Sequence, residues 1–331
     1  MRMLTSKAGF MSAALLLGVS GITAAQQDPK AADVLAGARK AIGKKLENLT
    51  TLSVQAATQR NIDNFQMTSD LELLVELPDK YLRSETSNSA MVNMSSTLGF
   101  NGDRALKGGG AMGTPGGGMM IRMGGPGPGA ATFGGGSEKL APEQQELMDK
   151  QIVRSARQEI SRLMLGWFGM AHPSLGVRYT YAGEAESPDG KAFMVDARND
   201  DGFSARLFID EKTHLPLMVT YQGPQPRVVT AGGPMTGGGN PPPAQAQPRQ
   251  MSPEEEKKLV ADARGQAEQM LRQPPMLVEY SLFFDDWREE DGIKFPHALR
   301  RASGGTTTEE WTVSKVKVNS KIDPKKFETE H

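Results

Sequence analysis

The four histidines are the first residues to consider for catalysis or metal binding, because imidazole is a common proton carrier and metal ligand at neutral pH. His172, His214, His297 and His331 stand far apart, and none belongs to an HExxH, triad or metal-ligand spacing. His172 precedes a proline and His214 lies in a predicted turn, so ordinary loop histidines are expected there. The glycine-rich stretch 108–136 lacks the Gly-Lys-Ser/Thr ending of a phosphate-binding loop. We therefore predict no enzyme class, no catalytic residue, no metal ligand and no cofactor.

A cluster of acidic residues near position 288 offers carboxylate oxygens, the ligands that calcium prefers. Its members are Asp285, Asp286, Glu289, Glu290 and Asp291. Arg288 lies among them and Lys294 follows, so the alternative is a solvated hairpin tip with balanced charge. We favour the hairpin tip.

Four methionines in the first glycine-rich stretch form a second cluster with possible metal chemistry. Met112, Met119, Met120 and Met123 offer thioether sulfurs, which suit Cu(I), so a copper-binding protein is a weaker alternative. The same side chains would also suit a mobile linker, or an adaptable apolar cover over a cavity.

The bulk composition excludes several partners. The 331 residues carry 38 basic and 39 acidic side chains and a formal net charge of −1, so no field favours nucleic acid. The chain has no cysteine, which excludes disulfides, thiolate metal sites and lipid attachment at cysteine. Its stability must therefore come from an apolar core.

The N-terminal segment has the pattern of a secretory signal peptide. Arg2 and Lys7 precede an apolar run over residues 8–22, and Thr23-Ala24-Ala25 supplies the small residues that signal peptidase needs. We predict cleavage after Ala25 and a periplasmic mature protein; the alternative is an uncleaved amphipathic anchor.

The rest of the chain is predicted to be built from β-hairpins. Runs at 278–285 and 293–301 alternate apolar and polar residues, and Asp291-Gly292 between them is a favoured hairpin turn. Similar runs predict about eleven antiparallel strands. The last, at 306–318, changes phase between Val313 and Val316, which predicts a bulge near Ser314.

Three helices are predicted: residues 33–46, a long amphipathic helix from Pro142 to about His172, and residues 252–271 after a capping box. The fold class is therefore α+β. After the signal peptide, residues 26–331 are expected to form one domain. Two Gly- and Pro-rich inserts, at 108–137 and 223–251, are expected to lack regular structure.

Two motifs, together with the N-terminal helix and the β meander, resemble the LolA-like group of periplasmic proteins that carry or sort outer-membrane lipoproteins. The motifs are Asp210-x-x-Thr213-x-Leu215-Pro216 and Asp285-x-x-x-x-x-Asp291-Gly292-Ile293-x-Phe295-Pro296. The resemblance implies a curved, unclosed antiparallel half-barrel packed on helices, whose concave face holds lipid or acyl chains. The chain departs from the group by its two long inserts.

An estimate of surface area leads to the same expectation. Such a sheet has an apolar face on the order of 1,000 Å², whereas the two packed helices cover roughly 400 Å² and 200 Å². The excess predicts a ligand cavity. Its expected lining is Leu71, Leu73, Val75, Ile160, Leu163, Trp167, Tyr280, Leu282, Phe284, Ile293 and Phe295.

These expectations favour a non-catalytic periplasmic carrier or chaperone for the acyl chains of lipids or lipoproteins. The alternative is an envelope-stress sensor that uses the same fold to bind a membrane-associated protein partner.

Overall fold

The structure is a computed structural model that describes residues 28–62, 65–88, 93–108, 119–123, 142–188, 190–225, 227–231 and 276–328. For 119–123 and 227–231 only the backbone is described. The predicted signal peptide, the predicted helix 252–271, Met112 and His331 lie outside these ranges.

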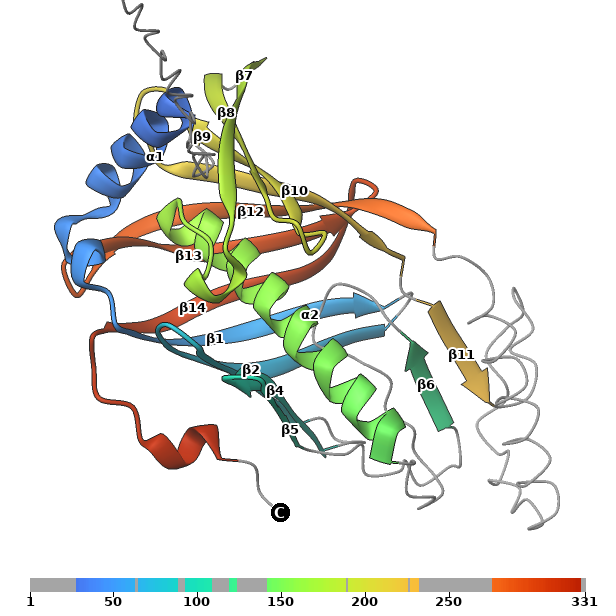
Figure 1. Ribbon diagram of the computed structural model, residues 1–331. Helices are drawn as coiled ribbons and strands as arrows, with labels where there is room; N and C mark the ends of the chain where they lie inside the picture. The colour runs from blue at the N-terminus through green and yellow to red at the C-terminus, as the bar shows by residue number, and fades with distance from the viewer. Residues whose placement is uncertain are drawn as a thin grey trace, which may run out of the picture.

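Twelve strands form a single antiparallel sheet in the order β5-β4-β3-β2-β1-β14-β13-β12-β10-β9-β8-β7 (Figure 1). The last strand of the chain, β14, lies beside the first, β1, and so joins the two halves of the sheet. The edge strands β5 and β7 do not pair with each other, so the sheet stays unclosed. The predicted α+β half-barrel is confirmed, with twelve strands in the sheet in place of about eleven.

The strands lie where alternating sequence predicted them. In the first half they are β1 (Thr51–Ile62), β2 (Phe65–Glu76), β3 (Lys80–Asn88), β4 (Asn93–Asn101) and β5 (Arg104–Gly108). In the second half they are β7 (Arg178–Ser187), β8 (Gly190–Arg198), β9 (Ser204–Asp210), β10 (Pro216–Pro224), β12 (Leu277–Glu290), β13 (Ile293–Ser303) and β14 (Thr306–Val318).

The predicted hairpin turn and bulge are both confirmed. Asp291 and Gly292 connect β12 to β13 with positive φ angles of 50° and 79°. In the β1–β14 ladder Gln55 pairs with Lys315 and Ala56 with Val313, which leaves Ser314 as the extra residue of a bulge.

Helix α1 (Pro29–Ile42) begins four residues earlier than predicted. The Asp28 carboxylate accepts hydrogen bonds from the backbone N–H groups of Lys30 and Ala31, and Pro29 occupies the first helical position. The helix ends at Gly43, whose φ of 142° interrupts it, and the predicted extension to Leu46 is a separate 3-10 turn (Lys44–Asn48). Asp28 also accepts from the Tyr181 backbone N–H at 3.0 Å, which ties α1 to the edge strand β7.

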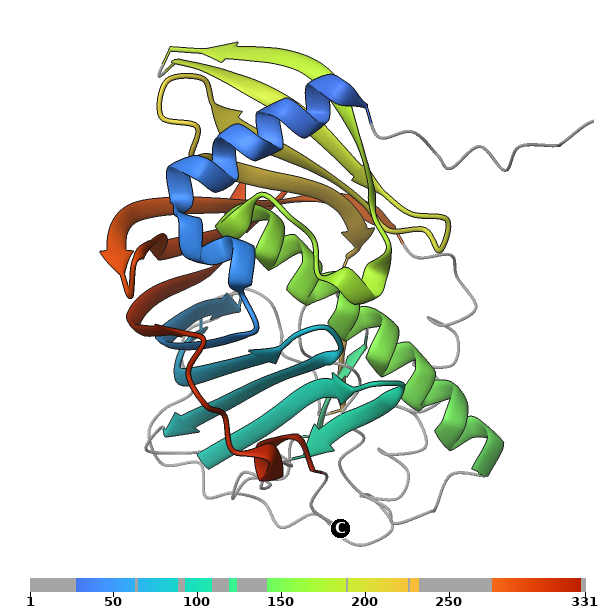
Figure 2. The ribbon, with the colours of Figure 1, turned by 60° about the vertical axis from the view of Figure 1, so that its left-hand side comes forward.

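Helix α2 (Pro142–Phe168) is the predicted long helix and lies across the concave side of the sheet, which curves around it (Figure 2). It ends before Gly169, whose φ is 62°, and a 3-10 turn over Pro173–Leu175 follows, capped by His172. At Gly166 an added Cβ would lie 1.9 Å from the Phe284 ring, so only glycine lets α2 approach β12 this closely. None of the helices within the described ranges combines the length and apolar character needed to cross a membrane.

The two inserts contain strands where none was expected. Within the predicted inserts, β6 (Met119–Met123) pairs with β11 (Arg227–Ala231) as an antiparallel two-stranded ribbon. Both segments are short runs free of glycine and proline, and β11 contains β-branched residues, so each has the composition of a strand. Gly108 and Gly223, the first residues of the two predicted inserts, belong to β5 and β10.

A short C-terminal segment covers part of the sheet face away from α2. The 3-10 turn Pro324–Phe327 places Phe327 against Leu74, Leu82 and Leu106, where its side chain is buried. The N-terminal half of the sheet is therefore packed on both faces at this point.

Candidate ligand-binding site

The eleven predicted cavity residues come together on the sheet face under the helices. Each is at most 4% exposed, and all belong to one core cluster, which we call the apolar region. Trp167 of α2 and Phe295 of β13 lie 5.2 Å apart between ring centroids. Within the twelve strands the exposed large hydrophobic residues are Leu217 and Leu277. Leu217 lies where the pairing of β9 with β10 shifts register, and Leu277 is out of phase with the buried Tyr280 and Leu282 of β12. Contrary to the area estimate, curvature and the two helices leave no uncovered apolar patch among the strand residues described.

An open groove of about 1030 Å³ lies on the outer face of β1 to β5, bounded by the C-terminal segment. Its floor includes Ser84 and Thr86 from β3 and Ser95 and Thr97 from β4, with Asp70 and Glu72 beside them. Leu71 is the one predicted cavity residue that contributes to its lining. A smaller hollow of about 90 Å³ lies between α1 and Tyr179. The polar floor of the groove does not suit an alkyl chain.

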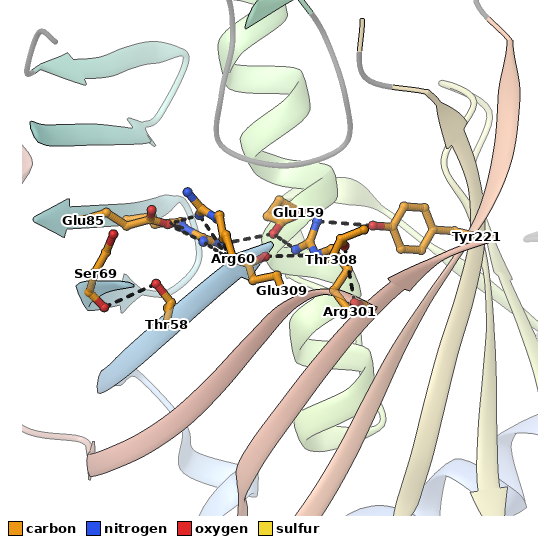
Figure 3. Close-up of polar contacts among 10 residues, drawn as sticks. Thr58, Arg60, Ser69, Glu85, Glu159, Tyr221, Arg301, Thr308 and Glu309 are labelled. Atoms are coloured by element: carbon orange, nitrogen blue, oxygen red, sulfur yellow. Dashed lines mark hydrogen bonds and ion pairs between the residues drawn. The ribbon is translucent and has the colours of Figure 1, made fainter. Parts of the chain in front are cut away.

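A layer of charged side chains crosses the concave face next to the apolar region, and Figure 3 shows it. We call it the charged layer; it consists of Arg60, Arg83, Glu85, Glu159, Arg301 and Glu309. Its base is a cross-strand row in which Glu309 of β14 stands between Arg60 of β1 and Arg301 of β13. Arg60 Nη2 lies 3.0 Å from Glu309 Oε1, and Arg301 Nε lies 3.3 Å from Glu309 Oε2.

Strand β3 adds a second arginine and carboxylate to the charged layer. Arg83, 1% exposed, donates to Glu85 through Nε at 2.6 Å and to Glu309 through Nη2 at 2.9 Å. Glu85 also accepts from Arg60 at 2.6 Å. The Arg83 guanidinium lies 4.8 Å from the centre of the Trp311 ring, so it is enclosed by ions on one side and an aromatic face on the other.

Helix α2 joins the charged layer through one residue, Glu159. Its Oε1 accepts from Arg301 Nη2 at 2.5 Å and lies 3.4 Å from Arg83 Nη1. Its Oε2 is buried without a hydrogen-bond partner among the described residues. Glu159 therefore links the helix to both halves of the sheet at one point.

Neighbouring opposite charges shift the pKa values of several members of the layer toward the ionised form. Burial alone would raise the pKa of Glu309, but Arg60, Arg83 and Arg301 together hold this pKa well below its usual value. The pKa of Glu85 is lowered in the same way, with burial opposed by Arg83 and Arg60. Burial would lower the pKa of Arg83, yet the neighbouring carboxylates of Glu85 and Glu309 raise it.

Arg162 lies one turn along α2 from Glu159 and differs from the other arginines. Its guanidinium carbon lies 4.1 Å from the centre of the Tyr221 ring, and Nη2 donates to Gln158 at 3.2 Å. Within the described part of the chain Arg162 forms no ion pair with a carboxylate, and its Nε is buried without a partner. Burial lowers the pKa of Arg162, with Tyr221 and Glu159 opposing the shift.

Sequence reasoning missed the charged layer, although a signal was present. Arg301 follows Phe295, His297 and Leu299 in the inward phase of β13, and Glu159 lies in the apolar stripe of α2. A charge in phase with buried residues predicts a buried ionic partner, because an isolated buried charge is too costly.

His172, His297 and two members of the acidic cluster make local contacts with other parts of the fold. His172 caps the turn after α2 and is 1% exposed; burial, with a smaller contribution from Arg157, lowers its pKa to about 4. His297 Nδ1 lies 3.0 Å from the Val313 carbonyl oxygen. In the acidic cluster Asp286 pairs with Arg288, and Asp291 pairs with Lys45 at 3.2 Å.

No group of three or more His, Asp or Glu side chains within the described ranges is arranged to hold a metal ion. The side chains of the alternative copper site, Met112, Met119, Met120 and Met123, lie outside what the structure describes.

Comparison with known proteins gives likenesses of fold. No protein-family model and no curated protein matches the sequence. A solved LolA-superfamily protein from Nitrosomonas europaea aligns over 89% of this chain and 96% of its own, with 9% identity and a TM-score of 0.44. A DUF1329 family protein from Desulfovibrio piger aligns over 91% and 98%, with 12% identity and a TM-score of 0.45.

A putative outer membrane lipoprotein-sorting protein domain from Vibrio parahaemolyticus aligns over 89% of this chain and 94% of its own, with 8% identity and a TM-score of 0.41. At such distances none of these proteins indicates what this chain binds. The unclosed antiparallel sheet with helices on its concave face is the architecture that the resemblance of the sequence motifs implied.

Proposed function

We propose that the chain is a non-catalytic periplasmic carrier that holds an acyl chain of a lipid or lipoprotein between α2 and the curved sheet. The observation that carries the proposal is the apolar region itself: β2, α2, β12 and β13 direct eleven large side chains to one face of an unclosed sheet. The cysteine-free composition and the signal-peptide pattern of residues 1–25 support the periplasmic location.

The apolar region is filled by its own side chains, so a bound tail has to displace part of the helical cover. The contact between α1 and α2 is the natural point of separation, because it is a small contact at the end of α2, where an added Cβ at Gly169 would lie 3.4 Å from that of Ala38. Burying a methylene group contributes about 0.8 kcal/mol, so an alkyl chain of a dozen carbons offers roughly 10 kcal/mol to offset the lost contacts.

The test is an organic extraction of the gently purified full chain, followed by mass spectrometry and titration of the delipidated protein with a fluorescent fatty acid. We expect acyl lipids in near-stoichiometric amount and saturable binding of the probe. A lipid-free extract without probe binding would refute the carrier, and recovery of a stable protein partner in its place would favour the envelope-stress sensor.

A further inference from the structure

Among the residues that the structure describes, the buried charges on the concave face do not balance. Arg60, Arg83, Arg162 and Arg301 supply four positive charges, whereas Glu85, Glu159 and Glu309 supply three negative ones. All seven side chains are largely buried: Arg60 is the most exposed member of the layer, at 12%, and Arg162 is 6% exposed. An uncompensated charge in such surroundings is unfavourable, so an anion would be bound favourably here.

The surplus positive charge belongs to Arg162, and its surroundings resemble one side of a binding site. Arg162 and Arg301 meet the same tyrosine: the Arg162 guanidinium lies 4.1 Å from the Tyr221 ring centre, and Arg301 Nη1 donates to the Tyr221 hydroxyl at 3.4 Å. Phe203 is a second aromatic neighbour of Arg162, with its ring centre 5.5 Å from the guanidinium carbon. The planar guanidinium is thus held by aromatic rings while its buried Nε lacks a partner among the described residues.

The surroundings of Arg162 and Arg301 adjoin the apolar region. Leu282 of β12 is the cross-strand partner of Arg301 on one side and of Val219 on the other, and its side chain is fully buried. Phe284, two residues further along β12, continues the apolar row away from the charges. A molecule with its anionic head at Arg162 and Arg301 would therefore extend its tail along Leu282 and Phe284.

We infer that Arg162, together with Arg301 and Tyr221, forms a headgroup subsite that selects amphiphiles with a phosphate or carboxylate head. The inference rests on the proposed carrier function and names its ligand class. A guanidinium matches both anions through paired N–H donors.

The test compares ligands with one tail and different heads. The full-length protein is titrated below the micellar concentration with dodecyl phosphate, dodecanoate and dodecyl maltoside, and with inorganic phosphate as a head without a tail. A charge-assisted hydrogen bond corresponds to roughly 10- to 100-fold in affinity, so we expect both anionic ligands to bind at least about tenfold more tightly than the maltoside. Whichever of dodecyl phosphate and dodecanoate binds more tightly identifies the preferred headgroup.

Arg162→Met is the decisive variant, because methionine keeps an unbranched side chain against Tyr221 but removes the charge. We expect it to lower the affinity for the anionic ligands to that for the maltoside. Because Arg162 has no carboxylate partner among the described residues, we also expect the unfolding midpoint of the Arg162→Met variant to stay at or above that of the wild type. Arg154→Met is the matched control, because Arg154 is exposed on the same helix and donates to the Asp201 carbonyl. This variant should keep the preference for anionic over neutral ligands. Arg162→Gln provides the second variant should the methionine substitution prevent folding.

Equal affinity of the wild type for anionic and neutral ligands would overturn the headgroup subsite and leave the carrier intact. An anion preference that survives in both Arg162 variants would do the same. If no amphiphile binds at all, the carrier itself fails, and binding of inorganic phosphate alone would show an anion site without a tail site.

Discussion

At the scale of single residues, the arginines and glutamates under α2 are the unusual feature of this protein. Buried ion pairs often add little net stability relative to apolar replacements, but removing one partner leaves an uncompensated charge. Glu159 is shared by Arg83 and Arg301, so it neutralises guanidinium groups from two strands that are far apart in the sequence. The layer is therefore sensitive to the loss of this one carboxylate.

We predict that Glu159→Gln lowers the free energy of unfolding by about 3–5 kcal/mol, because it raises the excess of buried positive charge from one to two. Denaturant unfolding at neutral pH measures the change. Glu146→Gln is the control on the same helix: Glu146 pairs with Lys150, but the two side chains are 67% and 70% exposed, so a far smaller effect is expected. Equal small effects of the two substitutions would mean that solvent reaches the charged layer.

At the scale of elements, close contact between α2 and the sheet depends on a glycine in the middle of a helix. Glycine there destabilises a helix by about 1 kcal/mol relative to alanine, so its presence at 166 indicates a packing requirement. The packing requirement comes from the Phe284 ring of β12, because two of its atoms lie 1.9 Å and 2.0 Å from the position of a Cβ at residue 166.

We therefore expect Gly166→Ala to destabilise the protein by about 1–3 kcal/mol, since the Phe284 ring or the helix has to shift. Gly37→Ala in α1 is the matched substitution: its nearest neighbour would be His214 Nδ1 at 3.4 Å, an ordinary contact, so improved helix propensity should stabilise the chain slightly. Thermal unfolding of both variants makes the comparison. Two variants of equal stability would show that α2 is packed more loosely than described.

At the scale of the whole molecule, the carrier hypothesis requires that the two helices separate to admit a tail. Because the chain has no cysteine, a pair of introduced cysteines is a clean means of preventing the separation. Ala38 and Gly169 suit the purpose, since their Cβ positions would be 3.4 Å apart, close to the usual spacing in a disulfide of about 3.8 Å.

We predict that the double variant Ala38→Cys, Gly169→Cys binds the fluorescent fatty acid more weakly when oxidised than when reduced, by about tenfold or more if separation costs at least 1.4 kcal/mol. Fluorescence titration before and after addition of a reductant measures both states of one protein. The two single-cysteine variants control for the strain of a side chain at Gly169, whose φ is 62°. Unchanged affinity on oxidation would show that a tail enters elsewhere.

The sequence by itself determined what depends on near neighbours along the chain. Alternation and the Asp-Gly turn predicted β12 and β13, the phase change predicted the bulge at Ser314, and three-and-four spacing predicted α2. The start of α1 was missed because Asp28 and Pro29, which set it, precede the apolar stripe. Which residues share the concave face also followed from local periodicity.

Only the tertiary structure decided how those faces meet. The members of the charged layer come from four strands and a helix, and Arg83 and Glu309 are separated by 226 residues, so no local spacing links them. The closure of the apolar face was likewise undetermined, because the area left by two helices depends on how strongly the sheet curves around them. Local sequence fixes the direction of a side chain, whereas curvature and strand order fix its partner.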